Sequence, residues 1–311
     1  MSEPTTVYPV GRADVGKRLD RFLQEKIPRL SRSRIQEMIR ARVLLSWDAR
    51  VRPATVLVAG GVVRIDYVPL PETILEQEIP VLARGDGWLA VDKPAGIPVH
   101  PVNKVRENTV IRMLRRQEGN EELRLAHRLD RETSGVLLVA ENSSTARTLS
   151  MAFENRQVKK EYLAVVRGVV QDQEGTIRLP VGKAPDSRVY VRQAAVSGYP
   201  SETGWQVEAR GAEATMLRLF PRTGRRHQIR VHLEAIGHPV LGDLLYGRPD
   251  QDYLDLVTGQ RDARKEEGGP DRQLLHCARL VIGSGPGALD CRASLPTQFH
   301  HWLEGSASSN S

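Results

Sequence analysis

The side chains with the clearest chemical potential lie together in the segment "LAHRLDRETSGVLLVA", residues 125–140. Asp130 stands directly before an apolar run and has Arg128 and Arg131 beside it. A carboxylate can act as a nucleophile or as a base, and neighbouring cations favour its ionised form. A salt-bridged surface turn has the same composition, so the choice between chemistry and a surface turn depends on the rest of the chain.

The sequence lacks the motifs of several other chemistries. It contains no P-loop, no GxGxxG after a strand, no GxSxG and no HExxH. His227 and His232 lie five residues apart and would point in different directions on a helix or a strand, so they do not indicate a metal site. Cys277 and Cys291 form no CxxC pair and are expected to be buried thiols. We therefore expect no metal and no other cofactor.

From residue 81 onward, short apolar runs follow one another with few helices between them. The spacing predicts helices at 109–117, at 143–156, where serines would cap the first turn, and at 227–237. Strands are predicted at 87–93, 135–140, 159–168, 175–181, 187–193, 205–210 and 214–220. This order predicts an α+β fold, in which helices and loops flank a largely antiparallel mixed sheet. Residues 249–273, rich in Asp, Glu, Arg and Gly, are interpreted as an exposed insertion.

Positive charge is concentrated at the N-terminus. The whole chain has a formal net charge of +7, and residues 1–66 alone hold 13 Lys and Arg against 7 Asp and Glu. Apolar spacing predicts one helix from about Leu19, which Pro28 ends. Ser33 and Gln36 have the spacing of a capping box at the start of a second helix.

The outer face of that second helix would carry Arg32, Arg34 and Arg40, and strands are expected at 43–46, 55–61 and 62–66. Such a basic α/β module is either a solvated surface or the binding face for a polyanion.

Composition also suggests where the chain divides. Residues 67–80 are rich in proline and glutamate and are interpreted as a linker between a small domain at 1–66 and a larger one at 81–305, with a disordered tail at 306–311. No stretch reaches the roughly 18 consecutive apolar residues of a membrane span, and the first residues lack the pattern of a signal peptide. We expect a cytoplasmic protein without membrane contact, and a monomer.

Two family resemblances connect these features. The segment "GKRLDRFLQEKIPRLSRSRIQEMIRARV" resembles the αL-type RNA-binding module first known from a ribosomal small-subunit protein. Five later blocks, in order, resemble the RluA family of pseudouridine synthases: "VDKPAGIPVHP", "AHRLDRETSGVLLVA", "VKKEYLAVVRG", "RTGRRHQIRVHLEAIGHPVLGDLLYG" and "LLHCARL". They cover most of residues 88–282, and Arg226 and Cys277 are small departures from the family pattern.

The family resemblance implies that the protein detaches a uridine base from its ribose, turns it over and rejoins it through carbon-5. Asp130 is the family's essential carboxylate, and the residues leave open whether it acts as nucleophile or as base. Arg230 is its family-matched partner, so we predict an Asp130–Arg230 ion pair and expect Arg230→Met to remove turnover while the fold survives. Tyr162 would stack on the uracil and assist proton removal from carbon-5.

RNA contacts follow from the same resemblance. Arg128 would fill the place that the flipped base leaves in the RNA stack. Arg32 and Arg34 of the N-terminal module are expected to bind phosphates. Arg225 and Arg226, with Arg222, would clamp phosphates next to the target nucleotide. His127 is interpreted as a structural group outside the catalytic set, and residues 133–135 as the turn that presents Asp130.

Three alternatives remain open at this level. Large-subunit ribosomal RNA is the favoured substrate, because the N-terminal module resembles a ribosomal one, and transfer RNA is the alternative. A non-catalytic RNA-binding or assembly factor could use the same module. A nucleoside glycosidase could use the same carboxylate without rejoining the base.

Overall fold

The computed structural model describes residues 5–28, 30–66, 72–102, 105–266, 268–283 and 288–304. The chain separates into two compact units, residues 1–72 and 73–311, and each is described by itself. The expected tail at 306–311 and the first part of the expected linker lie outside the described residues.

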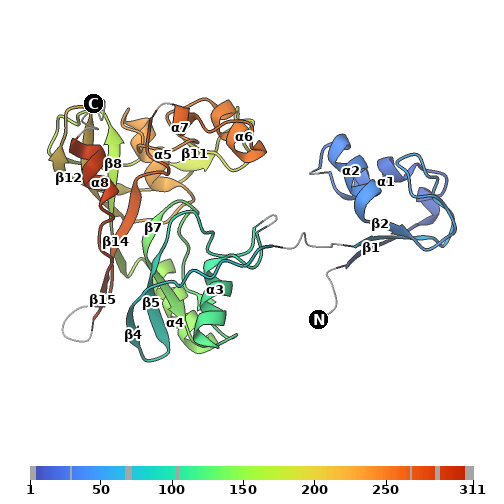
Figure 1. The fold of residues 1–311 in the computed structure, drawn as a ribbon, viewed down its shortest axis with the longest axis horizontal. Helices are drawn as coiled ribbons and strands as arrows, with labels where there is room; N and C mark the ends of the chain where they lie inside the picture. Colours follow the sequence, from blue (N-terminus) through green and yellow to red (C-terminus); the bar gives the residue numbers. More distant parts are fainter. Residues whose placement is uncertain are drawn as a thin grey trace. The chain divides into compact units, whose positions relative to one another are not determined.

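The N-terminal unit packs two helices on one face of a small sheet (Figure 1). Its elements are β1 (Thr5–Pro9), a 3-10 turn (Arg12–Asp14), α1 (Leu19–Lys26), α2 (Arg32–Arg42), β2 (Val43–Leu45) and β3 (Val62–Asp66). The strand order is β1-β3-β2, antiparallel throughout. Leu19, Phe22 and Leu23 of α1 meet Ile35 and Ile39 of α2 in the core. The two helices were therefore placed correctly by their apolar spacing.

Two details of this unit differ from expectation. The N-cap of α2 is Ser31, whose Oγ accepts from the Arg34 N–H, and the Ser33–Gln36 capping box is absent because Ser33 already lies in the first helical turn. The segment 55–61 is not a strand of the sheet. Its backbone pairs with the chain before α1, through Leu57 N–H to Lys17 C=O and Gly16 N–H to Leu57 C=O.

The larger unit is built on a ten-stranded sheet in the order β4-β5-β7-β14-β8-β13-β12-β9, with β15 paired to β14 and β6 to β7. Its strands are β4 (Val81–Gly85), β5 (Trp88–Lys93), β6 (Arg124–Leu125), β7 (Ser134–Ala140), β8 (Val158–Arg167), β9 (Glu174–Ile177), β12 (Thr203–Arg210), β13 (Ala214–Pro221), β14 (Leu275–Ile282) and β15 (Leu289–Arg292). A separate hairpin joins β10 (Val181–Lys183) to β11 (Gln193–Tyr199). Its helices are α3 (Val110–Glu118), α4 (Ser143–Glu154), α5 (Gln228–Ala235), α6 (Asp250–Thr258), α7 (Ala263–Glu266) and α8 (Gln298–Glu304).

Every pairing between these described strands is antiparallel except that of β7 with β14, so the α+β prediction with a largely antiparallel sheet is confirmed. Two adjoining cores cover the sheet: α3 and α4 pack near β5 and β7, and α5 packs near β8 and β13 (Figure 1). No described helix combines the length and the apolar character that a membrane span requires. Both cysteines are buried free thiols, as expected.

Expectations for the larger unit were wrong at the cap of α4 and at residues 187–192. Helix α4 is capped by Asn142, which accepts from the Thr145 N–H, and not by a serine. Residues 187–192 form a loop, because Ser187 and the Arg188 N–H both bind Asp250 instead of pairing with a strand. The hairpin strand β11 follows this loop and was not predicted.

The segment 249–273 is not a wholly exposed insertion. It forms α6 and α7, and Ala263, Arg264 and Gln273 within it are buried. Arg264 donates to Asp262 and, at 3.0 Å, to Glu132 in the segment after Asp130. Charged residues can lie inside when they are paired, which is why composition alone misplaced this segment.

Candidate active site

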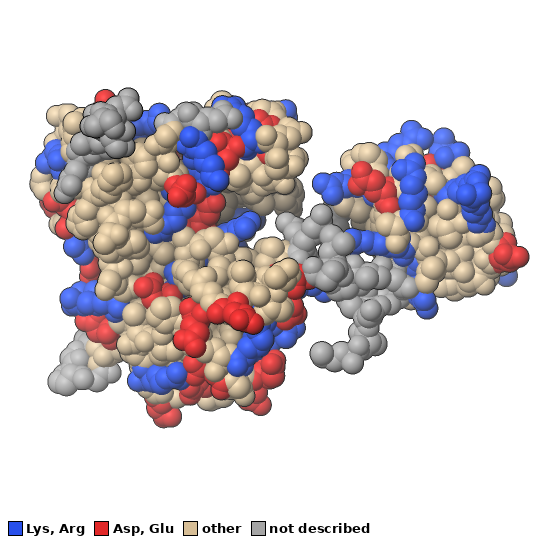
Figure 2. Space-filling model, viewed as in Figure 1, with Lys and Arg blue, Asp and Glu red and all other residues tan. Residues whose placement is uncertain are grey.

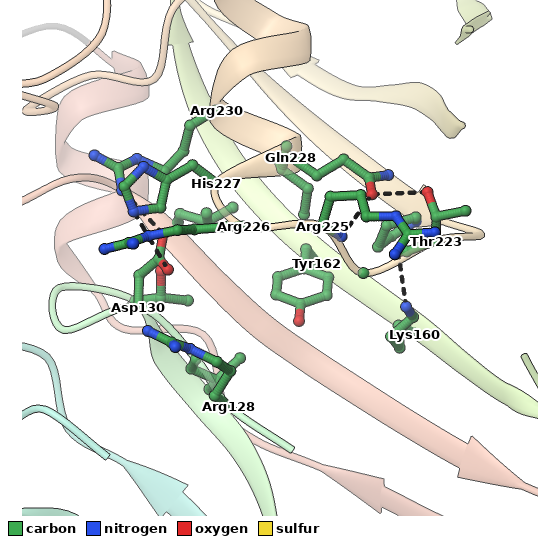
Figure 3. A pocket seen from close by; sticks show the side chains of 16 residues that line it. Arg128, Asp130, Lys160, Tyr162, Thr223, Arg225, Arg226, His227, Gln228 and Arg230 are labelled. Carbon is green, nitrogen blue, oxygen red and sulfur yellow. Dashed lines mark hydrogen bonds and ion pairs between the residues drawn. The ribbon is translucent and has the colours of Figure 1, made fainter. Parts of the chain in front are cut away.

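A pocket of about 160 Å³ opens where β8, the start of α5 and the loop before β7 meet (Figure 3). Asp130, Tyr162 and Arg230 all line it, together with Arg128, Arg225 and Arg226. The volume lies well below the roughly 300–1,000 Å³ of pockets for drug-sized ligands, and suits a single small ring. The structure therefore brings together six of the eight site residues that were predicted from the sequence.

The centre of the sheet explains why Asp130 and Tyr162 meet. In β14, Cys277 pairs with Gly135 of β7 on one side and with Tyr162 of β8 on the other. Gly135 has φ +105°, and a Cβ there would lie 2.2 Å from the Cys277 carbonyl oxygen, so no other residue fits without a shift of the backbone. This close contact fixes the start of β7, which follows the turn of Asp130, next to the strands that carry Cys277 and Tyr162, and both Asp130 and Tyr162 line the pocket.

Lys93 holds the segment that follows Asp130. Its fully buried Nζ donates to the carbonyl oxygens of Pro94, Arg131 and Thr133 at 2.7, 2.9 and 2.8 Å. Burial lowers the pKa of Lys93 to about 7, whereas three acceptors need three N–H donors and so favour the ammonium form. Lys93 therefore fixes the turn that presents Asp130.

Arg230 joins Asp130 to a second, deeper carboxylate. Its Nη1 donates to Asp130 Oδ2 at 2.9 Å, while Nε and Nη2 donate to the two oxygens of Asp243 at 2.6 and 2.8 Å. Asp243 Oδ1 also accepts from the N–H groups of Leu245 and Tyr246. The guanidinium lies 4.8 Å from the centre of the Tyr246 ring. The Asp130–Arg230 ion pair was predicted and is present. The bidentate ion pair between Arg230 and Asp243 was not predicted.

The surroundings of Asp130 favour its ionised form. Burial by itself would raise the pKa of Asp130, but His227, Arg230 and Arg128 face it, and the net pKa lies below the usual value. Burial also lowers the pKa of His227 to about 4, so His227 is neutral at pH 7 and Arg230 supplies the contacting positive charge. The Asp130 side chain remains 21% exposed, which leaves it open to a ligand in the pocket.

Tyr162 lies on β8 with its side chain in the pocket (Figure 3). Burial, and after it the neighbouring Cys277 and Asp130, raise the pKa of its hydroxyl well above the usual value. The hydroxyl therefore stays protonated at neutral pH. The ring contacts both main cores, so it has packing neighbours as well as an open pocket side.

The rim of the pocket beside Tyr162 is a loop held by several hydrogen bonds. Lys160 Nζ donates to the Thr223 carbonyl at 2.9 Å, and Gln228 Oε1 accepts from Thr223 Oγ1 and from the Arg225 N–H. Arg225 and Arg226 are exposed on this loop. Arg222, by contrast, forms an ion pair with Glu202 at 3.1 Å, so one of the three arginines expected to hold phosphates next to the target nucleotide already has a carboxylate partner.

Arg128 lies on the side of Asp130 that faces away from Arg230 (Figure 3). Its side chain is exposed and makes no hydrogen bond or ion pair within the described ranges. The carboxylates that could have paired with it are engaged elsewhere, Glu132 with Arg264 and Glu121 near Arg112 and Arg115. Arg128 is therefore available for an external partner.

His127 points away from the pocket. Its Nε2 accepts from the Leu138 N–H at 3.0 Å and its ring stacks on Phe153 with centroids 4.5 Å apart. Burial lowers its pKa to about 3, so it is neutral. His232 is also held internally, by Thr203 Oγ1 and the Leu179 carbonyl, and does not face the same space as His227.

Arg32 and Arg34 lie in the other unit, on the exposed face of α2. Lys and Arg gather on the visible face of that unit in Figure 2. Neither residue lines the pocket.

Sequence reasoning missed four residues of the site: His227 as a pocket residue, Asp243, Tyr246 and Lys93. The sequence offers only a weak indication of two of these residues. Asp243 and Tyr246 are polar groups inside the otherwise apolar "VLGDLLYG", and buried polar groups need partners.

A fold and site of this kind define an RNA pseudouridine synthase, an isomerase that converts uridine to pseudouridine. Residues 87–235 match the family model described as RNA pseudouridylate synthase. The chain is 34% identical over 307 residues to ribosomal large subunit pseudouridine synthase C of Haemophilus ducreyi, covering 94% of this chain and 92% of that protein. It is 35% identical over 282 residues to the Escherichia coli K12 protein of the same name, covering 86% and 85%.

The fold agrees with this comparison. The solved structure of human RNA pseudouridylate synthase domain containing 1 has a TM-score of 0.59 and 29% identity, covering 75% of this chain and 89% of that one. The chain belongs to the RluA-type family of RNA pseudouridine synthases.

Proposed function

We propose that this enzyme converts one or more uridines of large-subunit ribosomal RNA to pseudouridine. The observation that carries the proposal is the pocket, which is lined by Asp130, Tyr162 and Arg230 together with the exposed Arg128. The ribosomal substrate rests on the names of the bacterial relatives, which match this chain along most of its length. We further propose that the enzyme acts as a monomer in the cytoplasm, with residues 1–66 as an RNA-binding domain and residues 81–305 as the catalytic domain.

In the proposed reaction, Arg230 holds Oδ2 of Asp130, so Oδ1 is the oxygen offered to the ribose. Oδ1 acts either as a nucleophile at carbon-1′ or as a base at carbon-2′, and both routes break the bond from carbon-1′ to N1. The freed uracil turns over against Tyr162, and carbon-5 bonds to carbon-1′. On the nucleophile route this step breaks the ester bond between carbon-1′ and Oδ1, and on the base route Asp130 returns the proton to carbon-2′. The proton on carbon-5 then leaves. N1 gains a proton, so the product is an isomer of the substrate.

Arg128 is proposed to occupy the gap that the flipped base leaves in the RNA. Extrusion of a base costs a few kcal/mol, and a flat guanidinium can stack on the bases above and below the gap. Arg225 and Arg226 are proposed to hold the phosphates next to the target nucleotide.

The direct test uses ribosomal RNA labelled with tritium at uracil carbon-5, taken from cells that lack the protein. The synthase is expected to release tritium and to leave no abasic site, and mapping of the treated RNA then identifies the uridine. An abasic product would show a glycosidase, and binding without either product would show an assembly factor. Release from transfer RNA alone would move the substrate to that class.

Tyr162→Phe is expected to reduce pseudouridine formation by about 10²-fold, because the protonated hydroxyl is lost while the stacking ring remains. RNA affinity should change little. Tritium release and filter binding on the same RNA measure the two effects. Equal product from both proteins would make Tyr162 a packing residue only.

The double variant Arg32→Ala, Arg34→Ala is expected to weaken RNA binding and to reduce the slope of log K against log salt concentration by about one per lost phosphate contact. The rate at saturating RNA should persist, because these residues do not line the pocket. Arg116→Ala, Arg124→Ala removes the same charge from the other unit, and a salt slope altered equally in both variants would contradict the proposed role of α2.

A further inference from the structure

One oxygen of Asp130 has a neighbour that the reaction described above does not use. Asp130 Oδ2 is bound by Arg230, whereas Oδ1 lies 3.9 Å from His227 Nε2 (Figure 3). This distance is too long for a hydrogen bond. His227 nevertheless lines the pocket with a side chain that is only 8% exposed. The ring nitrogen Nε2 of His227 thus lies at the pocket beside the oxygen that reacts.

The backbone at His227 is held in an unusual conformation. His227 is the residue before α5 and has φ +56° and ψ +16°, in the left-handed region that non-glycine residues adopt uncommonly. The fixed neighbours account for it: the His227 carbonyl accepts from the Val231 N–H, and the ring packs edge-on against Tyr246 at 5.7 Å between centroids. These contacts therefore fix the orientation of the His227 ring.

The hydrogen bonds around the ring assign its tautomer. Tyr246 Oη accepts from the Gln193 backbone N–H at 3.0 Å and lies 2.8 Å from His227 Nδ1. If the Tyr246 hydroxyl donates to Nδ1, every group is used and Nε2 carries the ring proton. In the opposite tautomer, the Nε2 lone pair would face the Asp130 carboxylate and the hydroxyl proton would have no partner among the described residues. The first arrangement is therefore assigned.

The ring is also uncharged at neutral pH. Burial is the main cause of its low pKa, Asp130 and Asp243 act in the opposite direction, and Arg230 and Arg226 act with burial. A neutral ring with Nε2–H beside a carboxylate is a hydrogen-bond donor, and no described group lies within bonding distance of that donor.

We infer that His227 donates its Nε2–H to the ribose 2′-hydroxyl of the target nucleotide and so makes the pocket selective for ribose over deoxyribose. This inference rests on the proposed function. Whether Asp130 attacks carbon-1′ or deprotonates carbon-2′, its Oδ1 must lie against this edge of the sugar. The 2′-oxygen is attached there and can accept from the donor beside Oδ1. The 2′-hydroxyl is also the group by which a protein distinguishes RNA from DNA.

Two groups set the strength of this contact. Tyr246, which is 1% exposed, fixes the tautomer, and Gln193 orients the Tyr246 hydroxyl. Tyr246 is thus a positioning residue, and His227 is the residue that touches the substrate.

The test combines protein variants with a change of one atom in the substrate. The probe is a stem–loop RNA that carries the mapped uridine, compared with the same RNA that has 2′-deoxyuridine at that single position. His227→Asn keeps a residue that tolerates the left-handed backbone, but its amide ends near the position of Nδ1. His227→Gln is longer and can place an N–H near the position of Nε2. His238→Asn, at a half-buried histidine whose Nδ1 bonds to the Arg167 carbonyl outside the pocket, is the matched control.

On the ribose substrate, His227→Asn is expected to lower the single-turnover rate roughly tenfold, as for the loss of one hydrogen bond in a dry site, and His227→Gln to restore part of it. Tyr246→Phe should act in the same direction with a smaller loss. On the 2′-deoxyuridine substrate, all three should differ from the native enzyme by less than about twofold, because the acceptor is already gone. His238→Asn should match the native enzyme on both substrates.

Equal losses on both substrates would overturn the inference and leave His227 a structural group. If the deoxy substrate gives no product with the native enzyme, the same comparison is made with RNA affinities in the Asp130→Asn background. In that background, removal of the 2′-hydroxyl should weaken RNA affinity only when His227 is present. A native enzyme that forms no pseudouridine in any RNA would instead overturn the proposed function, and the two failures are therefore distinct.

Discussion

Asp130→Asn is expected to reduce tritium release by roughly 10⁴-fold while RNA affinity stays close to that of the native enzyme. Asparagine has nearly the same size, and its amide oxygen can still accept from Arg230 Nη1, so the pocket should keep its shape. The amide is neither a nucleophile nor a base, and the reaction therefore lacks its first step.

Asp290→Asn provides the matched control. Asp290 lies on β15, pairs with Arg279 and does not line the pocket. It should retain full activity. Single-turnover tritium release and filter binding measure both variants, and persistent release from Asp130→Asn would refute the assigned role of the carboxylate.

Arg230→Met is expected to lower turnover about 10³-fold and also to destabilise the protein by about 3–5 kcal/mol. The second effect comes from Asp243, which is 3% exposed and would be left as an unpaired buried charge. The sequence suggested only the partnership with Asp130, so it predicted that the fold would be unaffected. The two effects must therefore be separated.

A second substitution separates them. Arg230→Met, Asp243→Asn removes the buried charge, and thermal or urea unfolding should show that most of the lost stability returns while activity does not. Arg230 also lowers the pKa of Asp130, so its removal raises that pKa. As pH is lowered, the residual activity of the variant should therefore be lost at a higher pH than the activity of the native enzyme. Recovery of turnover in the double variant would show that Arg230 acts only through stability.

The sequence predicted those parts of the molecule that local pattern controls. Helix α1, the strands β7, β8 and β13, and the charge cluster around Asp130 each follow from apolar spacing and flanking residues. The errors arose where a distant partner decided the outcome. Segment 187–192 bends toward Asp250, about sixty residues away in sequence. Arg264 is buried because it pairs with Glu132, which lies 132 residues before it in the sequence.

The same distinction holds in the site. Asp130, Tyr162 and Arg230 were assigned by family resemblance, whereas the Asp243–Arg230 and Tyr246–His227 contacts depend on how the loop after α5 folds back. No periodicity encodes that return of the chain.

The position of β14 has a consequence for when the enzyme becomes active. The strands β7 and β8, which carry the turn of Asp130 and Tyr162, are not neighbours in the sheet; β14, residues 275–282, lies between them. During synthesis the chain grows from the N-terminus, so β7 and β8 are both made well before this central strand is available. Long-range pairings of this kind also form slowly. The turn of Asp130 and the strand of Tyr162 therefore exist before the strand that brings them together, and the catalytic pocket forms only once β14 has paired with both β7 and β8.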